Sequence, residues 1–79
     1  MKLYLLTRPD EQSAEYEEFI GAVVAADTAE EARRIHPGEA DGTTHARYWI
    51  TPDKVIVKLI GQADPSIPRG VVLDSFNAG

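Results

Sequence analysis

The chain contains no cysteine, one methionine and one tryptophan, and it has few basic residues. Without cysteine it has no disulfides, no thiolate metal ligands and no cysteine nucleophile. Its longest uninterrupted apolar run covers only a few residues, which argues against a membrane-spanning segment. Eight basic residues against 13 acidic ones give a net charge of −5. Because proteins that bind duplex DNA usually carry a basic field, this balance argues against that function.

The length of 79 residues predicts a single small domain that covers residues 1–79. A composition of 43% hydrophobic and 27% charged residues is ordinary for a globular protein. A chain this short buries little of its surface and folds with a small margin of stability. With no disulfide and no evident metal site, we expect a homo-oligomer, most simply a symmetric dimer. The alternative is a marginally stable monomer.

Several apolar segments rich in β-branched residues predict strands. The first has no polar residue and predicts a strand covered on both faces. An acidic stretch over residues 9–18 predicts a solvated loop. The predicted strands are residues 3–6, 19–26, 55–60 and 70–76, with residues 46–50 as a further short strand.

The predicted helix begins after Thr28. Threonine followed three residues later by Glu31 is typical of a capping box, in which Thr28 accepts a backbone N–H and Glu31 reaches back to the amide of the cap. Pro37 and Gly38 predict its end, so the helix has about two turns.

These elements predict an α+β fold with a mostly antiparallel, four- to five-stranded sheet and one short helix on one face, in β-β-α-β-β order. One helix of two turns cannot cover four or five strands. An uncovered sheet face or an open edge is therefore expected to meet water or another subunit.

Catalytic and metal-binding patterns are weak. His36 and His45 flank two acidic residues, but their spacing matches no short metal motif. Ser75 lies in no G-x-S-x-G turn, and no glycine-rich loop of the Walker or Rossmann type is present. We therefore predict no catalytic residue, no metal, no cofactor and no enzymatic activity.

The basic residues are unevenly placed. Only Lys2 and Arg8 precede residue 32, whereas arginines and histidines cluster over residues 33–47, ahead of Tyr48 and Trp49. Guanidinium groups bind phosphate and aromatic rings stack on bases, so this combination favours an anionic, ring-bearing ligand. The alternative is that the arginines complement the helix dipole and Trp49 fills the core.

The chain also resembles a group of short proteins encoded by bacterial phages and prophages. The resemblance rests on the first six residues, on the strand and helix over residues 22–37, on residues 55–61, and above all on the ending Ser75-Phe76-Asn77-Ala78-Gly79. It implies a phage accessory protein. Because the sequence shows no address signal and no cysteine, we expect the cytoplasm of a bacterial host as its location. It assigns no catalytic residue.

These observations predict a non-enzymatic, oligomeric module that binds a small anionic ligand, such as a nucleotide immune signal that it sequesters. The alternative is a protein-interaction module that caps a host protein through an exposed sheet edge or through residues 10–18. The residues predicted to bind the ligand are Arg8, Arg33, Arg47, Trp49, Ser75, Phe76 and Asn77.

Overall fold

The computed structural model describes residues 1–9 and 18–77, in which four strands form one antiparallel sheet. Strands β1 (Lys2–Thr7) and β2 (Glu18–Ala26) lie in the middle of the sheet. Strand β3 (Ile56–Gln62) pairs with β1, and β4 (Gly70–Asn77) pairs with β2. The order β3-β1-β2-β4 therefore places the last two strands of the sequence at the two edges. The α+β class with a small sheet is confirmed.

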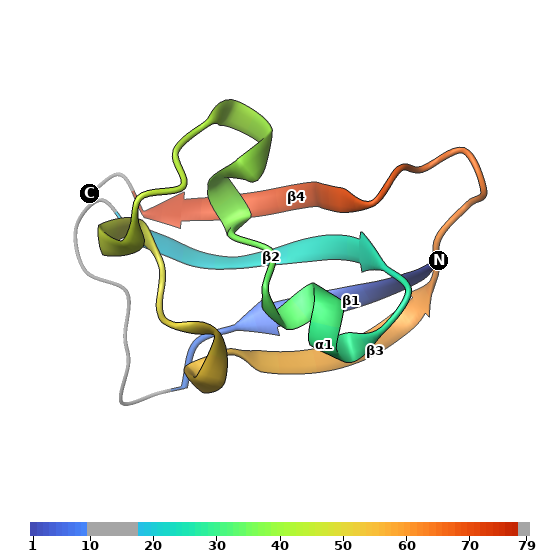
Figure 1. The fold of residues 1–79 in the computed structure, drawn as a ribbon, viewed down its shortest axis with the longest axis horizontal. Helices are drawn as coiled ribbons and strands as arrows, with labels where there is room; N and C mark the ends of the chain where they lie inside the picture. Colours follow the sequence, from blue (N-terminus) through green and yellow to red (C-terminus); the bar gives the residue numbers. More distant parts are fainter. Residues whose placement is uncertain (10–17, 78–79) are drawn as a thin grey trace.

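All helical structure in the described residues lies between β2 and β3. It comprises α1 (Ala29–Arg33) and three 3-10 helices, η2 (Pro37–Asp41), η3 (Ala46–Tyr48) and η4 (Pro52–Lys54). Figure 1 shows α1 in front of the sheet and η2 beside β4. No described helix packs on the other side of the sheet, which we call the open face, in contrast to the covered face beneath α1.

The hydrophobic core lies under the covered face. Tyr4 and Leu6 of β1 are opposite Val24 and Ala22 of β2, and directly opposed residues share a face. All four are buried. The remaining members of the core come from β2 and from the helical connection: Phe19, Ala26, Ala32, Ile35, Trp49 and Val55. Three of these ten residues are alanine or valine from β2, whose small side chains let the helical pieces approach the sheet closely.

Three β-bulges alter which face a side chain takes. Ile20 of β2 has no partner, because Phe19 and Gly21 pair with consecutive residues of β4. The extra residue turns Phe19 to the covered face, where it is 2% exposed, and leaves Ile20 49% exposed. The edge strands hold one such extra residue each, Ile60 in β3 and Val72 in β4.

The helix begins where the sequence predicts and ends earlier. The hydroxyl of Thr28 accepts the N–H of Glu31 at 3.1 Å. The carboxylate of Glu31 accepts the N–H of Asp27 at 3.1 Å, not that of Thr28 as predicted. The helix stops after little more than one turn, because the N–H of Arg34 turns to the carbonyl of Glu31 in 3-10 geometry.

The prediction of a fifth strand is wrong, and with it the simple β-β-α-β-β order. Residues 46–50 contain η3, whose first turn is capped because His45 Nδ1 accepts the N–H of Arg47 at 3.1 Å. Trp49 then enters the core and joins no sheet. Pro37, predicted to end the helix, instead opens η2. Three 3-10 helices thus separate α1 from β3.

Within a single copy, the described residues do not cover β1 on both faces, contrary to the prediction. Tyr4 and Leu6 are buried, whereas Leu3 and Leu5 on the open face are only half-buried. Of the predicted acidic loop, residues 10–17 lie outside the described part of the chain. None of the helices in the described residues is long and apolar enough to cross a membrane.

Candidate functional site

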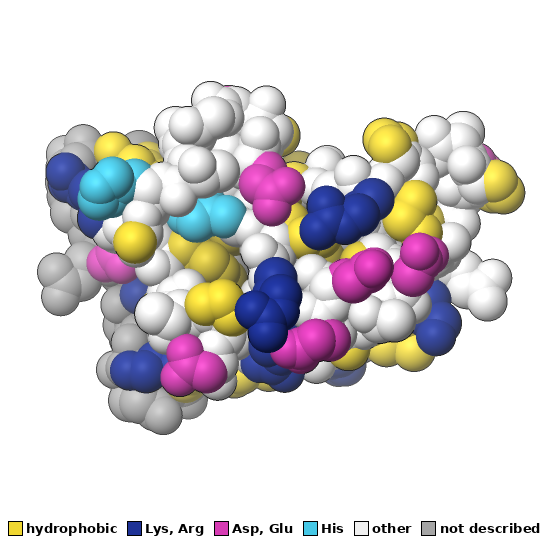
Figure 2. Space-filling view, in the orientation of Figure 1, with side chains coloured by type: hydrophobic (Ala, Val, Ile, Leu, Met, Phe, Trp, Pro, Cys, Tyr) yellow, Lys and Arg dark blue, Asp and Glu magenta, His cyan; other side chains and the backbone are white. Residues whose placement is uncertain are grey.

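A cleft of about 210 Å³ lies between α1 and the segment that leads from η3 to η4. We call it the basic cleft, because two arginines and a histidine line it and no acidic side chain does. Figure 2 shows the face of the molecule in question, where both histidines lie beside apolar side chains and basic and acidic side chains alternate near its centre. The lining residues are Arg33, Arg34, Ile35, His36, Thr44, Ala46, Trp49, Ile50, Thr51 and Pro52.

Arg33 and Arg34 lie at the end of α1 and make different contacts. Arg33 Nη1 donates to the carbonyls of Val55 at 2.7 Å and Pro52 at 3.1 Å, and so ties α1 to the start of β3. Arg34 makes no such backbone contact among the described residues. Its side chain is 67% exposed and donates to Glu30 at 3.4 Å. Arg33 therefore has a structural role, whereas Arg34 presents its guanidinium group at the mouth of the cleft.

His36 is held by both ring nitrogens. Its Nδ1 accepts the N–H of Gly38 at 3.0 Å, so the hydrogen of the neutral ring is on Nε2. Nε2 then donates to the carbonyl of His45 at 3.0 Å. In the same turn Glu39 accepts the N–H of His36 at 3.1 Å. The ring is therefore a fixed wall of the cleft.

Trp49 forms the floor of this region and is only 7% exposed. Its indole Nε1 is buried and makes no hydrogen bond within the structure as described. An unpaired buried donor costs about 1–3 kcal/mol. The guanidinium carbon of Arg8 lies 5.8 Å from the centroid of the indole ring.

Arg8 is itself part of the framework. It donates to the carboxylate of Glu18 and to the carbonyl of Phe19, both at 3.1 Å. Its side chain is 8% exposed and that of Glu18 is 20% exposed. The predicted ligand residues Arg8 and Trp49 thus lie together, with Arg8 joining the ends of β1 and β2.

A row of rings continues from the cleft to the end of β4. Phe19 lies 5.8 Å from His36 and 4.8 Å from Phe76, centroid to centroid. Tyr48 lies 6.1 Å from Phe76, and the guanidinium carbon of Arg47 lies 5.3 Å from the Tyr48 ring. The structure therefore brings the predicted residues Arg47 and Phe76 together through Tyr48, a ring that the predicted site lacked.

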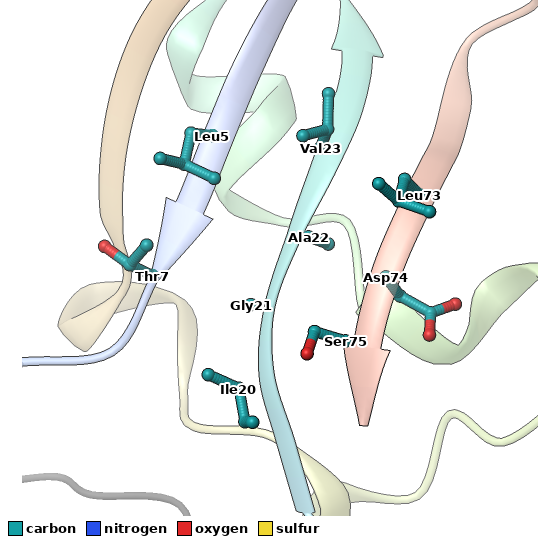
Figure 3. A pocket seen from close by; sticks show the side chains of 9 residues that line it. All are labelled: Leu5, Thr7, Ile20, Gly21, Ala22, Val23, Leu73, Asp74 and Ser75. Atoms are coloured by element: carbon teal, nitrogen blue, oxygen red, sulfur yellow. The ribbon is translucent and has the colours of Figure 1, made fainter. Parts of the chain in front are cut away.

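The other two predicted residues lie elsewhere. Ser75 is on the open face, opposite Gly21 (Figure 3), and Asn77 ends β4 opposite Glu18. The seven predicted residues therefore do not form one site. The predicted ligand residues include Arg33 but not Arg34 or His36, although the helix dipole explains all three equally well and nothing in the sequence separates them.

Two acidic groups lie close to the basic cleft, Glu30 beside Arg34 and Asp53 beside Pro52. Asp53 is in η4, and a hydrogen bond from the side chain of Thr51 lowers the pKa of this carboxyl below its ordinary value. Asp53 therefore remains charged at neutral pH. No group of three or more histidine and acidic side chains in the described residues could hold a metal ion.

Comparison of the chain with protein-family models, with curated proteins and with solved structures gave no match.

Proposed function

We propose that this protein is a non-enzymatic module that binds a small phosphate-bearing molecule, of mononucleotide size, in the basic cleft. The observation that carries the proposal is that Arg33, Arg34 and His36 meet Trp49 around one cavity with no acidic lining residue. Guanidinium groups form charge-assisted hydrogen bonds with phosphate, and an aromatic wall accommodates a ring. Sequestration of a nucleotide signal by a phage accessory protein is one role that such binding serves.

The size of the cleft limits the ligand. Pockets for drug-sized ligands usually measure about 300–1,000 Å³, whereas this cleft measures about 210 Å³. A phosphate with part of its nucleoside fits this space better than a cyclic dinucleotide does. The rest of a larger ligand would extend over the row of rings toward Tyr48.

The carboxylate of Glu30 is the natural competitor for the ligand. It lies 3.4 Å from Arg34 and 3.9 Å from Arg33. Its side chain is 62% exposed, and exposed ion pairs contribute only about 0.2–1 kcal/mol. An incoming phosphate can therefore replace Glu30 at Arg34 at little cost, while Arg33 keeps its backbone contacts.

Titration with inorganic phosphate and with AMP, ADP and ATP tests the proposal. Trp49 is the only tryptophan, so its fluorescence reports on the cleft. We expect saturable binding that Arg34→Ala weakens about tenfold, since a hydrogen bond to a charged group is worth about 1.5–3 kcal/mol. Glu30→Gln is expected to strengthen binding, because it removes the competing charge.

Arg69→Ala is the matched control. Arg69 is an exposed arginine in the connection between β3 and β4 and does not line the cleft. Its substitution removes the same charge and should leave the affinity unchanged. Equal losses of affinity in Arg34→Ala and Arg69→Ala would show that the effect comes from net charge alone. A titration in which no compound changes the fluorescence would refute the proposal.

A second candidate is a module that caps a host protein. It is favoured by the position of β3 and β4 as edge strands, because the unpaired backbone of an edge can accept a strand from another chain. This function leaves the nucleotide titration flat. If this second function is correct, the immobilised protein retains a host protein from lysate. A proline introduced into edge strand β4 abolishes this retention.

A further inference from the structure

The open face of the sheet contains an apolar hollow of about 250 Å³. Figure 3 shows the residues that line it: Gly21 has no side chain, and the side chains of Leu5, Ile20, Val23 and Leu73 stand around it. The hollow therefore lies over the middle of the sheet, on the side opposite the core.

The open face consists of three rows of residues that face one another across the four strands. Ile56, Thr7, Gly21 and Ser75 form one row, Lys58, Leu5, Val23 and Leu73 the next, and Gly61, Leu3, Ala25 and Gly70 the third. Lys58 is the one charged side chain in these rows, and it lies on an edge strand. An apolar centre with charge at the rim is the usual anatomy of a protein interface.

Large apolar side chains project from this face into solvent. Leu73 is 67% exposed, and Ile20 and Ile56 are each 49% exposed. Eight large apolar side chains of the described residues are at least 40% exposed; these three lie on the open face, whereas Leu59 and Phe76 lie on the covered side, opposite Tyr4 and Phe19. Exposed apolar side chains gathered on one face are typical of an interaction site.

We infer that the open face is the contact surface of a symmetric homodimer, in which Leu73 of each copy fills the hollow over Gly21 of the other. The projecting side chain and the hollow are neighbours on the same face. A twofold axis through that face therefore brings each projection to the partner's hollow, as an isologous interface requires.

The available area agrees with a dimer. The two longer extents of the molecule are 35 and 24 Å. A rectangle with these sides covers about 800 Å² and sets the upper limit for the projected area of this face, and each partner buries about that much in an interface of standard size. The basic cleft lies on the covered side, so the dimer leaves two clefts open to solvent.

Sedimentation velocity and native mass spectrometry test the inference with one matched pair of variants. Leu73→Asp places a charge in the centre of the proposed contact. Leu59→Asp makes the same change at a leucine that is 55% exposed but lies opposite Tyr4, on the covered side of edge strand β3. We expect a dimer of about 17 kDa from two 8.7 kDa chains for the unaltered protein and for Leu59→Asp. Leu73→Asp is expected to give a folded monomer, with unchanged circular dichroism.

A cysteine variant gives a second readout that does not depend on disruption. The chain has no cysteine of its own, so Ser75→Cys introduces a single thiol beside the hollow. Mild oxidation is expected to link two copies of this variant, whereas Thr51→Cys, on the covered side, stays unlinked. An unaltered protein that is monomeric at all micromolar concentrations overturns the inference. So does a dimer that survives Leu73→Asp, or one that both leucine variants weaken equally.

Discussion

The covered and open faces of the sheet are built from alternate residues of the same strands, yet they differ in what their side chains contact. On β1, Leu6 is fully buried under the helical connection, whereas Leu5, its neighbour in sequence, is half-buried on the open face. The covered face has short helices above it, and no described helix lies over the open one. Burial here is therefore decided by what packs on the sheet and not by the hydrophobicity of the strand.

The largest expected difference between the faces comes from one substitution made on each. Leu6→Ala removes a side chain with 0% exposure and should cost about 2–5 kcal/mol of unfolding free energy, since it leaves a cavity in the core. Leu73→Ala removes a side chain with 67% exposure and should change the stability of the monomer by about 0.5 kcal/mol or less. Urea unfolding at dilute concentration measures both. Equal costs would contradict the assignment of the two faces.

Gly21 lies on the open face, but a larger side chain there is expected to destabilise the fold, as a substitution in the core does. A Cβ atom at residue 21 would lie 2.6 Å from the carbonyl oxygen of Leu6, so the backbone must shift. Gly21→Ala should therefore cost about 1–3 kcal/mol. Gly61, in edge strand β3, is the control, because an added Cβ there has no described atom within 4 Å. A cost for Gly61→Ala equal to that of Gly21→Ala would show that loss of glycine in a strand, not crowding, is responsible.

The smallest of the three effects concerns the helix that covers the sheet. Thr28→Ala removes the hydroxyl that caps α1 and should cost about 1 kcal/mol. Thr28→Ser keeps the hydroxyl and should stay close to the unaltered protein. Thermal unfolding of the two variants separates the cap from the packing of the threonine methyl group. Identical losses in both would assign the effect to packing.

Local signals in the sequence predicted much of the fold. The cap at Thr28 and the positions of four strands can be read because propensity and capping act over a few residues. The segment over residues 46–50 has the apolar and aromatic content of a strand, but a strand also needs a neighbour with a free edge. That condition depends on tertiary structure. The three bulges and the strand order are not visible in the sequence for the same reason.

The candidate site was less predictable than the fold. The sequence indicates a cluster of arginines and rings, but it does not show which guanidinium groups are already occupied. Arg8 and Arg33 donate to backbone carbonyls of Phe19, Val55 and Pro52. Such partners have no side-chain signature. Residues that serve the framework and residues that face the cleft therefore look alike until the chain is folded.

The bulge at Ile20 marks a place where β2 can lose a residue and keep the faces of its side chains. Loss of the single codon for Ile20 would remove the extra residue and leave a regular ladder, with Phe19 still opposite Phe76 and Gly21 still opposite Ser75. Loss of the codon for Val23, in the regular pairing of β2 with β1, would instead move the side chains of β2 on one side of the gap to the opposite face. The connection between β3 and β4 carries no such alternation, so length variation there is expected to be tolerated, as is loss of Ile20, whereas loss of Val23 is not.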